Sequence, residues 1–379
     1  MVICMKRVSE NSLIKNLCRK VWRMVSCFIW IAFLTAICAC SDKEKDETLS
    51  IEDREITFIY EPDAWGDFGY NDLIYTGMLS YEKNMPSNVK LKYYSPQDFG
   101  EVDDLITDWK EDTTKSKKRL LVFPGSAYVE IVKTEFEDFP LDTLKDNILL
   151  FESDEIDIKG VHTFNVSSYG VSYVTGNIVS YICDSSALVV FANSSDTLLF
   201  KSVMNGFLDG IESGGKNGFV AYQYFLSNSF TGYAMEDTVY KMMHTWVKDY
   251  QFVFPVIGGS IVGMYRYMRE VGDDATFFTV GIDAIQDVFT TFSIGNLRKR
   301  MDKITELYLT EWTNGESLPK SATYGMQQGY TDWVLNSKFL KYIGLEVDDA
   351  TYLNEIKAEA MVKEIEYEND RLNSKSKWK

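Results

Sequence analysis

Residues 252–283, FVFPVIGGSIVGMYRYMREVGDDATFFTVGID, contain the pattern that decides the fold. Two continuous apolar runs, at 252–256 and 277–282, flank an amphipathic stretch of helical period at 263–270. Continuous rather than alternating apolar runs are typical of strands buried on both faces of a parallel sheet. The glycine pair Gly258 and Gly259 follows the first run, where backbone amides can approach a ligand at the start of a helix.

The same alternation extends along most of the chain. Apolar, β-branched and aromatic runs predict strands at 56–60, 89–94, 120–123, 148–151, 162–166, 188–192, 219–225, 252–256 and 277–282. Helical periodicity predicts helices between or after them at 72–84, 171–182, 200–212, 233–248, 263–270 and 297–312. Alternating strands and helices indicate an α/β protein built from right-handed βαβ units. Nine strands exceed what one small sheet needs, so we expect two lobes.

The N-terminus has the features of a bacterial lipoprotein signal. A basic stretch precedes the uncharged apolar run 24–39, which is shorter than the roughly 20 residues that span a bilayer. The junction Ile37-Cys38-Ala39-Cys40 is similar to a lipobox, so Cys40 is the expected lipidation site; a plain membrane anchor is the alternative. The acidic run 41–47 is either a solvated tether or a tag for export to the outer leaflet of the outer membrane.

These features predict a domain plan. The segments are a signal peptide at 1–39, an acidic tether at 40–53, lobe I at 54–184 plus 293–315, lobe II at 185–292 plus 316–340, and a charged helical tail at 341–379. Within the tail, the helix 353–371 is mostly solvated and is expected to pack on the outside of the fold.

Composition limits the function classes. A chain of 379 residues with 45% hydrophobic residues, 8 Trp, 23 Tyr and 23 Phe is globular rather than disordered. Its net charge of −17 argues against binding to nucleic acid. The two histidines exclude a multi-histidine metal site, and no P-loop or Gly-x-Ser-x-Gly motif occurs. We therefore expect no metal, no cofactor and no enzymatic activity.

Four loops at the carboxyl ends of predicted strands contain residues suited to binding. They are 63–72 with its carboxylates, aromatic rings and glycines, 124–128 with Ser126, 255–260 with Gly258 and Gly259, and 281–283 with Asp283. Ligands of doubly wound sheets bind at this edge. Each loop alone is more often a turn or a helix cap, but four at one edge favour a binding site.

Seven short motifs occur in a fixed order between residues 56 and 336. They are Gly66-Asp67-Phe68-Gly69-Tyr70-Asn71-Asp72 with Tyr75 and Gly77, Ser172-Tyr173-Val174-Thr175-Gly176, Gly206-Phe207 with Gly210, Ser229-Phe230, Phe254-Pro255 with Gly258, Gly259 and Gly263, Gly281-Ile282-Asp283, and Tyr324-Gly325-Met326 with Gly329. Together they resemble the basic membrane protein family, the purine-nucleoside-receptor lipoproteins that serve ABC importers. The resemblance implies a periplasmic-binding-protein type I fold, with two Rossmann-like lobes, three crossovers near Cys183, Ser293 and Gly315, and a ligand in the cleft.

The resemblance also implies roles for individual residues. Tyr70 and Phe230 would stack on a nucleobase, with Trp65 or Phe68 as substitutes, and each stacked base is worth about 1–3 kcal/mol. Asp67, Asn71 and Asp72 would bind base edges, although Asp72 could equally cap a helix. Asp283 would accept the ribose hydroxyls. Its cationic partner would be Lys299 if the chain has an insertion after Ser293, whereas Asn296 takes that position otherwise.

Three hypotheses follow. The first is a monomeric solute-binding lipoprotein that captures a nucleoside for an ABC transporter permease and touches the membrane only through its lipid. The second keeps the fold with another ligand, such as a sugar or a nucleobase. The third is a surface-exposed interaction, adhesion or sensing lipoprotein with a vestigial cleft. All three place the protein in the bacterial cell envelope, at the outer membrane or on the periplasmic face.

Overall fold

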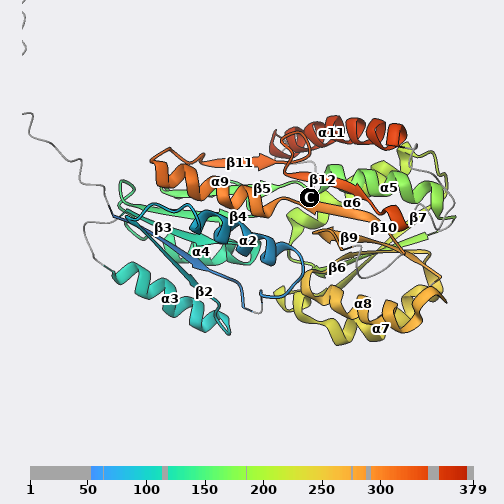
Figure 1. The fold of residues 1–379 in the computed structure, drawn as a ribbon, viewed down its shortest axis with the longest axis horizontal. Coiled ribbons are helices and arrows are strands. Elements are labelled where there is room, and N and C mark those ends of the chain that lie inside the picture. Colours follow the sequence, from blue (N-terminus) through green and yellow to red (C-terminus); the bar gives the residue numbers. More distant parts are fainter. Residues whose placement is uncertain are drawn as a thin grey trace, which may run out of the picture. The chain divides into compact units, whose positions relative to one another are not determined.

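A computed structural model describes residues 53–62, 64–112, 118–184, 186–274, 276–286, 292–339 and 350–373. These residues form two six-stranded sheets (Figure 1). The first has the order β11-β5-β4-β3-β1-β2, with β1 (Arg54–Ile59), β2 (Val89–Tyr94), β3 (Lys118–Phe123), β4 (Asp146–Phe151), β5 (Val161–Val166) and β11 (Ser321–Tyr324). The second has the order β12-β10-β9-β8-β6-β7, with β6 (Ser186–Asn193), β7 (Val220–Ser227), β8 (Phe252–Val256), β9 (Phe278–Asp283), β10 (Ser293–Lys299) and β12 (Thr331–Leu335).

Neighbouring strands are parallel except for the pair β10 and β12. Each of the nine predicted apolar runs overlaps one of the first nine strands, which confirms the α/β class. The signal peptide, Cys40 and the acidic run 41–47 lie outside the described residues. No helix in the described part of the chain is long and apolar enough to cross a membrane.

Helices cover both faces of the first sheet because its strands are apolar on both sides. Leu120 and Val122 of β3 pack with α2 (Tyr70–Glu82) and α9 (Met301–Asn314). Leu121 and Phe123 point the other way, toward α3 (Phe99–Glu111) and α4 (Val129–Phe136). Successive side chains of a strand alternate between faces, so one continuous apolar run supplies two cores.

The second sheet is built in the same way. Val189 and Phe191 of β6 pack with α5 (Tyr169–Ile182) and α6 (Thr197–Ser213), whereas Leu188 and Val190 pack with α7 (Glu236–Asp249) and α8 (Ile261–Val271). Short 3-10 turns lie at 126–128, 230–234, 258–260 and 272–274.

The chain passes between the sheets three times, at places that differ from the expected lobe boundaries. Helix α5 packs with the second core, so the first crossover lies before it, at Ser167 and Ser168, rather than near Cys183. Strand β10 pairs with β9 and β12, so residues 293–299 belong with the second sheet and the next crossover is at Arg300. Strand β11 pairs with β5, which places the third crossover at 325–330 rather than near Gly315. Strand pairing and helix packing with distant residues decide these boundaries.

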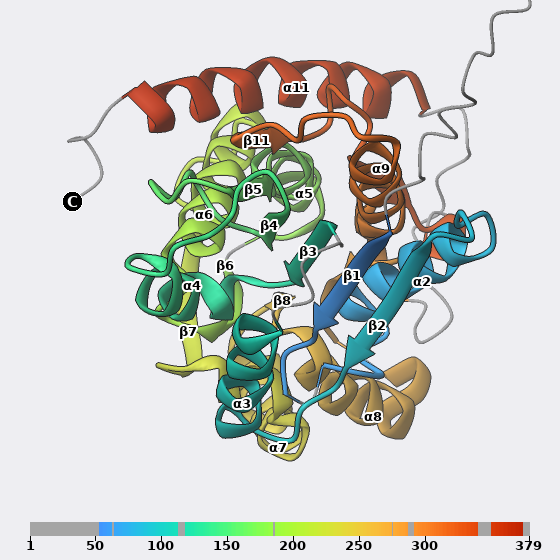
Figure 2. The same ribbon diagram turned by 90° about the vertical axis from the view of Figure 1, so that its left-hand side faces the viewer.

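Helix α11 (Ala350–Asn373) lies along the outside of α5, as the sequence predicted for a charged helix in this region (Figure 2). It is not merely solvated, because Ile356 and Ala360 enter the second core. Its carboxylate Glu364, 3% exposed, accepts hydrogen bonds from the backbone N–H groups of Gly170 at 3.1 Å and Met326 at 2.7 Å. These two residues flank the first and third crossovers.

Further contacts from α11 reach the same crossovers. The hydroxyl of Ser167 donates to Glu368 at 2.7 Å, and Arg371 pairs with Glu368 and with Asp154, which follows β4 of the first sheet. A Cβ at Gly325 would lie 2.2 Å from Oε2 of Glu364, so a larger residue there would displace this carboxylate. The helix therefore braces the segments that connect the two lobes.

Replacing Glu364 with alanine is expected to lower the free energy of unfolding by about 2–3 kcal/mol. Two charge-assisted hydrogen bonds would be lost, each worth about 1.5–3 kcal/mol, and the burial cost of the carboxylate, whose pKa is raised by burial to about 7, offsets part of the loss. Urea denaturation measures the change. Glu366→Ala, on the exposed side of the same helix, is the control, and equal effects of the two substitutions would contradict the bracing role.

Candidate ligand-binding site

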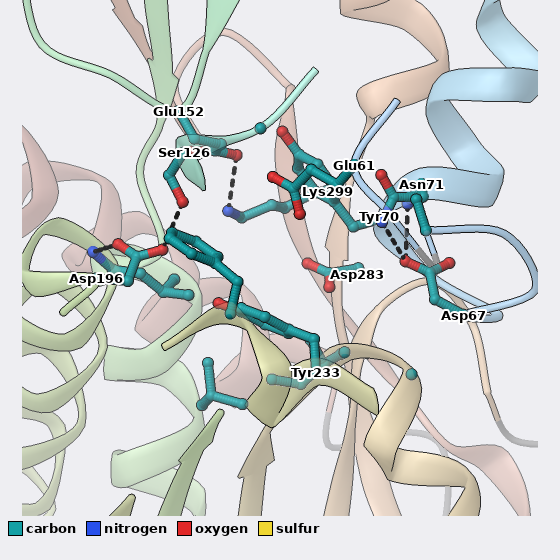
Figure 3. Close-up of a pocket in the computed structure, with 18 of the residues that line it drawn as sticks. Glu61, Asp67, Tyr70, Asn71, Ser126, Glu152, Asp196, Tyr233, Asp283 and Lys299 are labelled. Carbon is teal, nitrogen blue, oxygen red and sulfur yellow. Dashed lines mark hydrogen bonds and ion pairs between the residues drawn. The ribbon is translucent and has the colours of Figure 1, made fainter. Parts of the chain in front are cut away.

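A cavity of about 300 Å³ lies where the carboxyl ends of the strands in both sheets meet. Its walls come from residues that follow or end β1 to β10, so both lobes contribute (Figure 3). Nine of the predicted ligand-binding residues line it: Asp67, Tyr70, Asn71, Ser126, Phe230, Gly258, Gly259, Asp283 and Lys299. Phe68 and Asp72 do not.

Asp67 fixes the loop between β1 and α2. Its Oδ1 accepts hydrogen bonds from the backbone N–H groups of Gly69 at 2.9 Å and Asp72 at 3.3 Å. Its Oδ2 accepts from the backbone and the side chain of Asn71, at 2.9 and 3.1 Å. Burial raises the pKa of Asp67, and these N–H donors partly oppose the rise. The carboxylate is therefore held by the start of α2 while it faces the cavity.

The two predicted residues outside the cavity have structural roles. Asp72 accepts hydrogen bonds from the backbone N–H groups of Gly66 and Phe68, both at 3.0 Å, so it holds the loop that precedes α2. Phe68, with φ of 52° and half of its surface exposed, is not part of the cavity lining. Trp65 packs against Tyr75 with ring centroids 4.5 Å apart and does not line the cavity either.

Four aromatic side chains line the cavity, namely Tyr70, Phe99, Phe230 and Tyr233. Phe230 and Tyr233 stack with ring centroids 6.2 Å apart at an interplanar angle of 19°. Tyr70 lines it as well, and its buried hydroxyl has no hydrogen-bond partner in the part of the chain that the structure describes. Burial and the surrounding carboxylates raise the pKa of both tyrosines far above the usual value, so both hydroxyls stay protonated. A buried hydroxyl without a partner is available to a ligand.

Lys299 connects the lobes inside the cavity. It ends β10 of the second sheet, and its Nζ pairs with Oε1 of Glu152, which follows β4 of the first sheet, at 3.1 Å. Burial alone would lower the pKa of Lys299, but Glu152 and Asp283 raise it above its usual value. Asn296, the alternative position for the cation, is fully buried and accepts a hydrogen bond from the backbone of Gln286. Of the two, only Lys299 lines the cavity.

Asp283 is the last residue of β9 and has φ of 62°, a conformation that few residues other than Gly, Asn and Asp adopt. Burial raises the pKa of its carboxyl to about 7, and Lys299 opposes this rise. Asp283 and Lys299 therefore place a carboxylate and an ammonium on neighbouring strands at one wall of the cavity.

A second hydrogen bond also links the lobes. The hydroxyl of Ser126, after β3, donates to Oδ2 of Asp196, after β6, at 2.8 Å. The other oxygen of Asp196 accepts from the backbone N–H of Leu199 and caps α6. Gly258 and Gly259 lie opposite Tyr233, and a Cβ at Gly258 would lie 2.6 Å from its ring. Because Gly258 has no side chain, the ring of Tyr233 can occupy this part of the cavity wall.

Sequence reasoning missed other residues of the site, among them Glu61, Asp98, Glu152, Asp196 and Tyr233. Glu152 directly follows β4 and Glu61 lies two residues after β1, so the rule that singled out Asp283 would have found both. Burial raises the pKa of Glu61 to about 7. Among the described residues, no group of three or more His, Cys, Asp or Glu side chains has an arrangement that could hold a metal ion.

Residues 55–370 match the family Bmp, described as ABC transporter substrate-binding protein PnrA-like. The chain belongs to this family. Bmp is consistent with the basic membrane protein family that the motifs indicated, so that prediction is confirmed. The family and its fold are those of solute-binding proteins of ABC transporters. A comparison with curated proteins gave no match.

Solved structures similar to this Bmp protein share its fold at low sequence identity. A solute-binding protein of an ABC transporter system from Aeropyrum pernix K1 has a TM-score of 0.63 and 14% identity, covering 82% of this chain and 92% of the other. A transcriptional activator of the comK gene from Bacillus halodurans has a TM-score of 0.56 and 14% identity, covering 83% and 97%. GanP, a glucose-galactose binding protein from Geobacillus stearothermophilus, has a TM-score of 0.54 and 10% identity, covering 75% and 98%. The type I periplasmic-binding-protein fold is confirmed.

Proposed function

We propose that this chain captures a nucleoside in the cavity between its lobes and presents it to an ABC importer. The observation that carries the proposal is that aromatic rings from Tyr70 and Phe230 and the charged pair Asp283 and Lys299 line one cavity. A nucleoside needs both, because its base stacks on rings and its vicinal ribose hydroxyls donate to a carboxylate. A cavity of about 300 Å³ is at the lower end of the range for small-molecule sites, which suits a ligand of this size.

Native mass spectrometry of the freshly purified protein, followed by calorimetric titration with adenosine and inosine, tests this function. We expect a co-purified mass of a nucleoside, or saturable binding of at least one of the two compounds. Absence of both results would contradict a nucleoside ligand and leave the family membership untouched.

A sugar is the second candidate, because GanP is described as a glucose-galactose binding protein and another similar structure, from Actinobacillus succinogenes, contains D-allose. Carboxylates beside aromatic rings also suit a sugar, whose hydroxyls donate and whose C–H face packs on a ring. Titration with D-glucose, D-galactose and D-allose separates the two candidates, since a site built for a nucleoside should not saturate with these sugars.

The third hypothesis, an interaction or sensing lipoprotein whose cleft is vestigial, has less support than a ligand-binding protein. Tyr70 and Asn71 line the cavity, and the Tyr70 hydroxyl and Asn71 Oδ1 are buried without a hydrogen-bond partner among the described residues. Such atoms are costly unless a ligand or water satisfies them. We propose a binding protein without enzymatic activity, acting as a monomer.

The proposed anchor is a lipid on Cys40, which places the protein in the cell envelope. Cys40→Ala is expected to abolish metabolic labelling with a fatty-acid analogue, because the lipobox cysteine carries the acyl chains. Cys183→Ala, at a buried thiol, is the control. Unchanged labelling of Cys40→Ala would contradict the anchor. Protease treatment of intact cells then distinguishes the outer leaflet, which is expected if the acidic run 41–47 is an export tag, from the periplasmic face.

A further inference from the structure

The wall of the cavity carries a strong excess of negative charge. Six acidic side chains line it, namely Glu61, Asp67, Asp98, Glu152, Asp196 and Asp283, against one basic side chain, Lys299. Buried charges need a partner, because removing them from water is costly. A cavity carboxylate that has no hydrogen-bond donor or cation within the protein therefore indicates a donor or positive charge that the ligand must supply.

Four of the six carboxylates are compensated by the described part of the chain. Glu152 pairs with Lys299. Asp67, Asp98 and Asp196 each accept backbone N–H groups at the starts of α2, α3 and α6. The exposed N–H groups at a helix N-terminus carry partial positive charge and stabilise a carboxylate there. These four need nothing from a ligand.

Asp283 is partly compensated. No hydrogen bond or ion pair joins its carboxylate to another described residue, but the charge of Lys299 lowers its pKa against the effect of burial. Glu61 has no such help. Its carboxylate accepts a hydrogen bond from the backbone of Ala127, and burial and the neighbouring carboxylates of Asp196 and Asp67 raise its pKa. Within the described part of the chain no ion pair joins Glu61 to a lysine or arginine, whereas Lys299 pairs with Glu152.

The fold makes room for Glu61 at this position. Gly125, which follows β3, faces it, and a Cβ there would lie 1.9 Å from Oε1 of Glu61. Glu61 lies two residues after the end of β1, so the sheet edge positions it at the cavity. Glu61, Tyr70, Tyr233 and Asp283 all line this cavity, and Figure 3 shows them around it.

We propose that the ligand carries a protonated amino group and that Glu61 is the residue that recognises it, with Asp283 as a second acceptor. This inference rests on the proposed function and narrows it to amino-bearing ligands, such as an aminonucleoside. Buried carboxylates interact more strongly with an ammonium than with a neutral hydroxyl, because the hydrogen bond is charge-assisted on both sides.

Titration calorimetry at pH 7 with two matched pairs of compounds tests the inference. The pairs are adenosine with 5′-amino-5′-deoxyadenosine, and D-glucose with D-glucosamine; within each pair an amine replaces a hydroxyl. We expect the amino compound of at least one pair to bind at least tenfold more tightly than its neutral partner. In Glu61→Gln this preference should disappear, whereas Glu130→Gln, on the exposed surface of α4, should retain it.

The outcomes separate the inference from the proposed function. Adenosine binding as tightly as its amino analogue, or more tightly, supports a nucleoside ligand and overturns the charge requirement. A preference for D-glucosamine without binding of either nucleoside supports the charge requirement and contradicts the nucleoside. A preference that survives in Glu61→Gln assigns recognition elsewhere and overturns the inference, as does failure of all four compounds to bind.

Discussion

Nucleoside binding is expected to weaken about a hundredfold when Asp283 is replaced by alanine. Asp283 lines the cavity at the end of β9, beside Lys299 of β10. If its carboxylate accepts both ribose hydroxyls, each charge-assisted hydrogen bond is worth about 1.5–3 kcal/mol. A loss of about 3 kcal/mol corresponds to roughly a hundredfold in the dissociation constant. Calorimetric titration of adenosine against both proteins measures the change.

Two controls separate binding from folding. Adenine, which lacks the ribose, should bind both proteins equally. Asp283→Asn keeps the side-chain shape and tolerates the φ of 62°, whereas alanine there costs about 1–2 kcal/mol of stability. The asparagine variant should therefore melt like the wild type and still bind adenosine more weakly. Unchanged affinity in both variants would show that Asp283 only shapes the end of β9.

Replacing Lys299 with methionine is expected to lower the free energy of unfolding by about 3–5 kcal/mol. The Lys299 and Glu152 side chains are 8% and 15% exposed, and removing one partner leaves a buried carboxylate uncompensated. Asp283 also loses the charge that opposes its raised pKa. Urea denaturation of the ligand-free protein measures the effect.

The double variant Lys299→Met/Glu152→Gln is the matched test of this prediction, because it removes both charges. It should regain most of the lost stability. The loss in the single variant should be larger at pH 8 than at pH 5, since burial raises the pKa of Glu152 and the unpaired carboxyl takes up a proton more readily at low pH. Equal losses in the single and double variants would show that Lys299 stabilises the fold through packing alone.

The first nine strands could be predicted because each is a continuous apolar run, a signal that local sequence carries by itself. Strand β10, SIGNLRK, could not, and the helix predicted at 297–312 begins inside it. Contacts with residues outside the strand stabilise it. Asn296 accepts a hydrogen bond from the backbone N–H of Gln286. The absence of a side chain at Gly295 leaves space for the ring of Trp333 in β12. Strand membership here depends on partners that are far away in the sequence.

The site was predictable to the extent that it follows strand ends. Asp67, Tyr70 and Asp283 were singled out from the loops that follow β1 and β9, and they line the cavity. Asp72 and Phe68 show the limit of this reasoning. Both follow β1 as Asp67 and Tyr70 do, yet Asp72 accepts hydrogen bonds from the backbone of the preceding loop and Phe68 is half exposed.

The contact between Glu364 and Gly325 couples two positions that evolution would have to change together. A relative without a carboxylate at the position of Glu364 has room for a small side chain at the position of Gly325, whereas a relative that keeps the carboxylate in this place is expected to keep the glycine. The residue pair should therefore vary jointly among homologues. An alignment would reveal from this pair alone which relatives share a C-terminal helix docked on the crossovers.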